Sequence, residues 1–234
     1  MTTPRERMLA RIRSGLEKNR PILEHEAAAG SHTPPTHVHP IYETDLAELF
    51  AAELRKLSAY AHVCADEEEA LEVIRSILAA GEVQAAITWE DAQIGLGGLD
   101  TLLNTLGVTR HTVAIERDAG TRAAALQQLE PATACISGID IAIAESATLV
   151  VHSGPGRPRL ASLLAPIYIA IVRRDQLVRG LGEALARLKG EYAPDLFAER
   201  SALPLITGPS RTADIEMTLA LGVHGPREIH AVIV

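Results

Sequence analysis

The chain has 234 residues, 47% of them hydrophobic, which is enough for one large domain or for one domain with a small appendage. A net charge of -8 without a basic patch argues against nucleic acid as a direct partner, and two cysteines without a Cys-x-x-Cys pattern argue against a disulfide framework or an iron–sulfur cluster held by this chain. No apolar run approaches the roughly 20 residues that cross a bilayer, and no signal-peptide pattern opens the chain, so we expect a cytoplasmic protein.

The amino-terminal region predicts an amphipathic helix over residues 4–19, in which arginines lie mostly opposite an apolar face. That face consists of Met8, Leu9, Ile12 and Leu16. Residues 20–41 contain several prolines and show no periodicity, which is typical of a linker or an extended arm. We therefore expect an amino-terminal helix and arm over residues 1–42 and a main domain over residues 43–234.

The arm is rich in histidine, at His25, His32, His37 and His39. Their spacing fits no compact ligand set, and neither cysteine nor aspartate lies among them. We therefore expect no metal site, and no other cofactor is indicated by the sequence.

The rest of the chain alternates between predicted helices and strands. Helices are expected over residues 43–59, 66–80, 99–106, 119–129, 160–164 and 175–188, and strands over residues 63–65, 84–89, 112–116, 133–137, 148–152, 167–172 and at the carboxyl terminus. Asp66 and Glu69 have the spacing of a helix-capping box, and Gly81 has the position of a helix end. This alternation predicts an α/β fold with a mainly parallel open sheet and helices on both faces.

The segment from Leu205 onward reads as a strand, a polar turn over residues 207–212 and a helix. Free backbone N–H groups and the positive end of a helix dipole would converge at that turn, which favours binding of an anion. The candidate binding residues are Thr207, Gly208, Ser210, Arg211, Thr212, Asp214 and Glu216. A purely structural interpretation stays open, because acidic residues in a first turn also complement the dipole. His224 has two open roles, as a ligand contact or as a solvated or capping side chain.

Two further residues carry potential chemistry. Glu145 lies in an otherwise apolar segment, where burial would raise its pKa and suit a proton carrier. The alternative is a carboxylate that caps backbone amides or pairs with an arginine such as Arg157. Arg157 itself lies in a Gly/Pro loop, where its guanidinium suits a carboxylate or phosphate, although such a loop is also an ordinary surface turn.

Several of these segments resemble the lactate utilization protein C group of the LUD domain family. They are residues 138–150 (GIDIAIAESATLV), 156–164 (GRPRLASLL), 206–219 (ITGPSRTADIEMTL) and 222–227 (GVHGPR). The similarity extends over roughly residues 60–234 and, more loosely, over the first helix. One departure concerns the family's Glu-Thr-Gly-Thr-like turn, which here reads Glu145-Ser-Ala-Thr148 and lacks the glycine that adopts positive φ easily.

The resemblance implies a sugar-phosphate isomerase and CoA-transferase-like fold. It also implies a role in oxidising L-lactate to pyruvate beside partner subunits that carry iron–sulfur clusters, with a site around Glu145, Ser210, Arg211, Asp214 and Glu216. Two hypotheses remain open. The chain is either an accessory subunit that binds a small anion or its iron–sulfur partner, or a stand-alone isomerase-like or CoA-transferase-like enzyme in which Glu145 carries a proton.

Overall fold

The computed structural model describes residues 3–28, 45–112, 119–192, 202–213 and 219–234. The chain divides into two units, Met1–Tyr42 and Glu43–Val234. No helix among the described residues is both long enough and apolar enough to span a membrane.

The first unit contains the helix α1 (Pro4–Ala28), which is longer than the predicted 4–19. A proline in a helix removes one backbone hydrogen bond, and for that reason Pro21 was expected to end the helix. Strong helix formers such as leucine, glutamate, lysine and alanine flank Pro21 on both sides, and they favour continuation. The apolar side chains of Met8, Ile12 and Leu16 are exposed on this helix.

The second unit is built on a six-stranded sheet with the strand order β1-β12-β7-β4-β2-β3. All five neighbouring pairs are parallel, which confirms the predicted α/β fold. The strands are β1 (Tyr60–Val63), β2 (Ala85–Thr88), β3 (Thr109–His111), β4 (Ala134–Ser137), β7 (Ile167–Val172) and β12 (Glu228–Ile233). The third strand precedes the predicted 112–116, most of which lies outside the described residues. Strands β2, β4 and β7 are buried throughout, as central parallel strands covered on both faces require.

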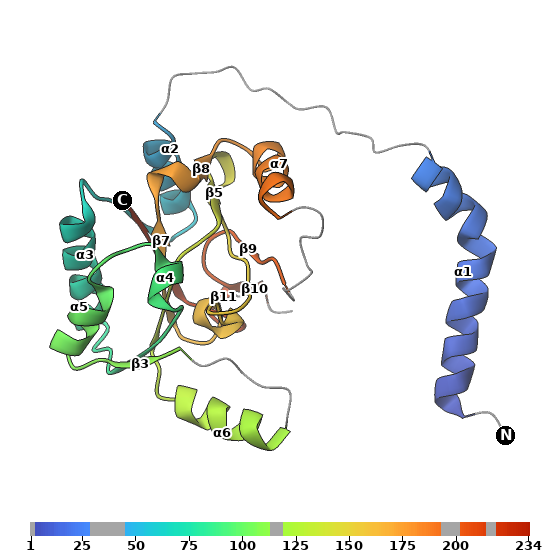
Figure 1. Ribbon diagram of the computed structural model, residues 1–234, viewed down its shortest axis with the longest axis horizontal. Coiled ribbons are helices and arrows are strands. Elements are labelled where there is room, and N and C mark those ends of the chain that lie inside the picture. Colours follow the sequence, from blue (N-terminus) through green and yellow to red (C-terminus); the bar gives the residue numbers. More distant parts are fainter. Residues whose placement is uncertain (1–2, 29–44, 113–118, 193–201, 214–218) are drawn as a thin grey trace. The chain divides into compact units, whose positions relative to one another are not determined.

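Helices and short 3-10 turns connect the strands. The helices are α2 (Leu46–Lys56), α3 (Glu67–Ala80), α4 (Asp91–Ile94), α5 (Leu99–Thr105), α6 (Ala119–Leu129) and α7 (Leu181–Glu191), and the 3-10 turns are η1 (Ala144–Ser146), η2 (Arg159–Ser162) and η3 (Arg174–Gln176). Figure 1 shows β7 of the six-stranded sheet with α3 on one side and α7 on the other. The cap of α3 is partly as predicted: Asp66 Oδ1 accepts from Glu69 N at 2.9 Å, and Gly81 follows the last turn. Glu69 Oε2 accepts from Ala65 N at 2.7 Å, one residue before the N-cap, so the reciprocal bond of a capping box is shifted by one residue.

A smaller four-stranded sheet has the order β8-β5-β6-β9, with β8 (Leu177–Val178), β5 (Ile141–Ile143), β6 (Thr148–Val150) and β9 (Leu205–Ile206). Buried side chains of β5, β6 and β8 pack with Ala184 and Leu188 of α7. The helix predicted over 175–188 therefore begins only at Leu181, because Leu177 and Val178 pair with β5.

The helix predicted after residue 212 is wrong. Arg211–Ala213 form the strand β10, which pairs antiparallel with β11 (Leu219–Leu221). The sequence contains the signal for this hairpin, because apolar residues alternate with polar residues from 213 to 219. That period of two is typical of a strand, whereas an amphipathic helix repeats every three to four residues.

Candidate functional site

The turn over residues 207–212 leads into the strand β10, so within the described residues no helix begins at this turn to direct its positive end at it. Gly208 adopts φ +77 and lies so close to α2 that an added Cβ would stand 3.0 Å from Leu57 Cβ. The guanidinium of Arg211 donates to the carbonyl oxygen of Leu57, which is the residue that caps the carboxyl end of α2. Helix carboxyl ends carry partial negative charge, and this local field disfavours an anion. The predicted anion site therefore lacks the positive helix end on which the prediction was based, and the carboxyl end of α2 lies there instead.

The same turn lies at the amino ends of the parallel strands. Ser210 N donates to Pro226 O at 3.1 Å, and Pro226 comes shortly before β12. Ligands of open α/β sheets bind at the opposite edge, beyond the carboxyl ends of the strands. Thr212 belongs to β10, His224 is exposed, and Asp214 and Glu216 lie outside the described residues.

The structure brings Glu145 into the neighbourhood of Thr207. Ser146 Oγ lies 2.8 Å from Thr148 Oγ1, which lies 2.7 Å from Thr207 Oγ1, so a chain of hydroxyl groups joins the two segments. The Glu145 carboxylate is 32% exposed and lies 3.9 Å from the guanidinium of Arg179. This geometry favours the interpretation in which the Glu145 carboxylate pairs with an arginine. That arginine is Arg179 and not Arg157, which was suggested from the sequence.

The turn that contains Glu145 has a positive φ at Ala147, the position at which the family's turn has glycine. Ala147 follows η1 with φ 48 and ψ 44, in the left-handed region. For a residue with a Cβ this conformation costs about 1–2 kcal/mol relative to the right-handed one. Strained residues tend to cluster at functional sites, so the turn stays of interest.

Arg157 belongs to a different cluster, at the carboxyl ends of β2 and β4. Its Nη1 lies 2.7 Å from Asp140 Oδ1, its Nε donates to Gln93 Oε1 at 2.7 Å, and its Cζ lies 5.0 Å from the centre of the Trp89 ring. Trp89 directly follows β2, and Asp140 comes shortly after β4. In the chain, β2 is followed by β3 on one side and then by β4 on the other side of it. Such a change of direction is where open α/β sheets form their binding crevices.

Asp140 fixes the position of Arg157. Its side chain is only 2% exposed, and besides Arg157 it accepts Tyr192 Oη at 2.7 Å and His152 N at 2.6 Å. Within the described part of the chain, no hydrogen bond is recorded from Nη2 of Arg157, which leaves donor capacity on a positioned guanidinium. Sequence reasoning missed Asp140, Trp89 and Gln93. The signal for Asp140 was present, since it is a charged residue in the same apolar run as Glu145.

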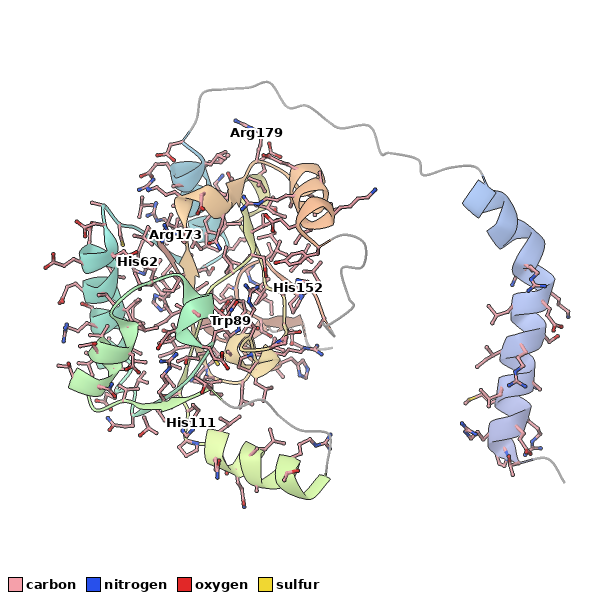
Figure 2. All side chains as sticks on the ribbon, in the orientation of Figure 1. His62, Trp89, His111, His152, Arg173 and Arg179 are labelled. Atoms are coloured by element: carbon pink, nitrogen blue, oxygen red, sulfur yellow. The ribbon has the colours of Figure 1, made fainter. Side chains whose placement is uncertain are left out.

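The two clusters lie at opposite ends of the β5–β6 hairpin. Asp140 N donates to Val150 O at 2.9 Å at one end, and Glu145 lies in η1 at the other end. Five residues at about 3.3 Å per strand residue separate the carboxylates by roughly 15 Å. Figure 2 shows the separation, with Trp89 near α4 in the middle of the unit and Arg179 at its top, near α7. The predicted site residues therefore do not form a single pocket.

The cysteines are poor metal ligands in this fold. Both are buried, and burial raises the pKa of the Cys64 thiol and raises that of Cys135 to about 11. Among the residues that the structure describes, no group of three His, Cys, Asp or Glu side chains is arranged to hold a metal ion. Of the four histidines predicted not to bind metal, His32, His37 and His39 lie outside those residues.

Comparison with known proteins identifies the family. The LUD domain matches residues 47–234. Lactate utilization protein C of Geobacillus sp. (strain WCH70) is 33% identical over 171 residues, which cover 71% of this chain and 68% of the relative. The protein of that name from Halalkalibacterium halodurans is 34% identical over 161 residues, 66% of this chain and 64% of the relative. The chain thus spans about two thirds of the length of these curated relatives.

A solved structure shares the fold. The crystal structure of a DUF162 family protein from Deinococcus radiodurans superposes with a TM-score of 0.54 at 22% identity and covers 83% of this chain and 99% of that one. The family match extends from α2 to the last strand and includes both clusters described above. This chain belongs to the LUD domain family.

Proposed function

We propose that the chain takes part in lactate utilization as a component without a redox centre of its own, and that it binds a small carboxylate at Arg157. The names of the relatives support the first part, together with the two buried thiols. The second part rests on one observation. Arg157 is positioned by Asp140 and Gln93 against Trp89, at the edge of the sheet where this fold class binds ligands.

The chemistry around Arg157 suits a 2-hydroxy or 2-oxo acid. A guanidinium presents N–H donors in a planar fork that matches the two oxygens of a carboxylate. Trp89, Arg157 and Arg159 line a narrow crevice that also includes Ser153 and Ser162. The crevice is closed in this structure and has no room for a water-sized molecule, so binding of a small acid requires these side chains to move apart. Ser153 Oγ donates to Ala202 O and Ser162 Oγ donates to Arg159 O, so these hydroxyl groups can accept a hydrogen bond from the hydroxyl of lactate. Arg159 is exposed at the crevice, so it adds a second positive charge there.

Replacing Arg157 with lysine tests this site. Lysine keeps a positive charge beside buried Asp140 but loses the planar fork, so the dissociation constant for L-lactate or pyruvate should rise by about tenfold, a change of 1.4 kcal/mol. Trp89 is the only tryptophan of the chain and lies next to Arg157, so its fluorescence reports binding directly. Lactamide, which has the shape of lactate without its charge, should not bind.

Two variants at the other end of the hairpin serve as controls for the Arg157→Lys experiment. Arg179→Lys makes the same chemical change beside Glu145, and Glu145→Gln removes the proposed proton carrier. Both should keep the parental affinity for the carboxylate. Equal loss in Arg179→Lys, or unchanged binding in Arg157→Lys, would contradict the proposed site.

The alternative function, an isomerase-like or CoA-transferase-like enzyme with Glu145 as proton carrier, is favoured by the strained Ala147 beside Glu145. It differs from the first in requiring turnover by the isolated chain that Glu145→Gln abolishes. The 32% exposure of the Glu145 side chain and its contact with Arg179 give it less support than Arg157 has.

We further propose that α1 docks onto the iron–sulfur partner subunits that the family resemblance implies. The helix exposes Met8, Ile12 and Leu16 four residues apart, and its described part is rich in arginine. Such a helix binds an apolar groove with an acidic rim on a partner. Ile12→Glu should therefore abolish co-purification with the partner subunits from lactate-grown cells, whereas Ser14→Glu, which adds the same charge on the opposite face of the helix, should reduce it only slightly. Co-purification of Ile12→Glu at the parental level would reject this role.

A further inference from the structure

A second open groove lies between α3 and the strands β1 and β12, and it is not part of either cluster described above. It encloses about 680 Å³ and has an apolar floor and a polar rim. The floor is formed by Val73, Ile77 and Ile167, and the exposed rim by Glu69, Glu72, Ser76, Ala80 and Glu228. The volume lies in the range of small-molecule sites, which are mostly apolar with a few polar groups that fix orientation.

Two histidines form one wall of this groove. His62 Nε2 lies 3.2 Å from His230 Nδ1, and the His230 ring stacks on Tyr60 with ring centres 4.6 Å apart. Burial, followed by the charge of Arg55, lowers the pKa of His62, and burial, followed by His62, lowers the pKa of His230 to about 4. Both imidazoles are therefore neutral at neutral pH. Figure 2 shows His62 beside α3, in agreement with its place in the groove lining.

His230 has an atom that needs a partner. The residue is 8% exposed, and its Nε2 makes no hydrogen bond within the described part of the chain. Its nearest charged neighbour, Glu228 Oε2, lies 3.7 Å away, which is too long for a hydrogen bond. Buried polar atoms without a partner are rare and call for an explanation, and an unoccupied ligand position is one. The His62–His230 hydrogen bond is compatible with two tautomers: Nε2 of His230 is an acceptor when Nδ1–H donates to His62, and it carries a proton directed toward Glu228 when His62 donates instead. Binding of a cation would select the first tautomer.

The surrounding charges select the ligand. With both histidines neutral, the charged groups on the groove lining are the carboxylates of Glu69, Glu72 and Glu228. Among them, Glu69 already accepts from Ala65 N, and Glu72 pairs with Arg75 at 3.0 Å. Arg55 acts on His62 through its charge but does not line the groove, and it donates to Ala61 O at 3.0 Å. Glu228 is thus the carboxylate that can form an ion pair with a ligand bound next to His230.

We propose that this groove binds a small organic cation, an amidinium, guanidinium or ammonium group on an apolar body. One N–H of the cation donates to His230 Nε2, and its charge faces Glu228. The apolar body lies on Val73, Ile77 and Ile167. An anion would face the carboxylates, and a neutral ligand would leave Glu228 without a counter-charge.

Benzamidinium and benzamide provide a matched pair of probes with nearly the same shape and different charge. We expect titration of the full chain with benzamidinium to saturate and to shift the imidazole nitrogen resonances of His230 in NMR spectra at pH 7. Benzamide should leave them unchanged. Binding of benzamide as tight as that of benzamidinium, or unshifted His230 resonances with both probes, would overturn the proposal.

Two carboxylate variants locate the charge that the cation meets. Glu228→Gln should weaken benzamidinium binding by about threefold, the size expected for an ion pair with a half-exposed carboxylate. Glu68→Gln removes the same charge from the first turn of α3 at a position that does not line the groove, and it should leave the affinity unchanged. Both substitutions are at exposed positions, so folding is preserved. An equal loss in the two variants would show a general charge effect and would overturn the site.

Discussion

Replacing Asp140 with alanine is expected to lower the free energy of unfolding by about 3–5 kcal/mol, the range measured when one partner of a buried ion pair is removed. The Asp140 carboxylate is 2% exposed and accepts hydrogen bonds from the Arg157 guanidinium, Tyr192 Oη and His152 N. Alanine leaves all three donors without this acceptor, and it leaves a largely buried guanidinium without its counter-charge. Urea unfolding at pH 7, followed by circular dichroism, measures the loss.

The control for this variant is Asp175→Ala. Asp175 is 76% exposed and lies 3.7 Å from Arg173, so its removal should change stability by less than about 0.5 kcal/mol. The double variant Asp140→Ala/Arg157→Met should recover part of the loss, because no uncompensated charge then stays buried. A change below about 1 kcal/mol in Asp140→Ala would mean that the carboxylate does not organise this cluster.

The fold was largely predictable because the main sheet carries strong local signals. Strands β2, β4 and β7 read as short runs of apolar residues between turn signals, and Asp66 marks the start of α3 by the cap it forms. The carboxyl-terminal hairpin was missed because the polar turn over 207–212 has the residues of a helix start. Its competing signal, the alternation after residue 212, decides the outcome in the structure, since Arg211–Ala213 pair with β11.

The site was predictable only in part, because local sequence patterns predict helices and strands but not which distant segments come into contact. Glu145 and Thr207 were expected to be close, and a chain of hydroxyl groups joins their segments. Arg157 was also singled out, but its partner was not identified. Asp140 and Glu145 occur in the same apolar run, and only the β5–β6 pairing shows that Asp140 lies at the end that Arg157 reaches.

Gly138→Ala is expected to destabilise the fold by about 1–3 kcal/mol, the usual cost of forcing extra atoms into a packed interior. A Cβ at Gly138 would stand 2.6 Å from Gln93 O and 2.8 Å from Ile94 O, and both of these atoms belong to the backbone of α4. The backbone of α4 must therefore shift, and Gln93 shifts with it. Urea unfolding measures the loss, and Gly190→Ala is the control, because Gly190 lies in α7 with nothing within 4 Å of an added Cβ. That substitution should stabilise the protein by up to about 1 kcal/mol.

The same variant connects packing to the proposed function. Gln93 accepts the Nε–H of Arg157 at 2.7 Å, so a displaced α4 loosens one of the two contacts that hold the guanidinium. Carboxylate binding, followed through Trp89 fluorescence, should then weaken in Gly138→Ala at urea concentrations where the variant is still fully folded. Gly190→Ala should bind as the parent does. If Gly138→Ala is destabilised but binds with parental affinity, then Asp140 alone positions Arg157, and α4 contributes to stability without shaping the site.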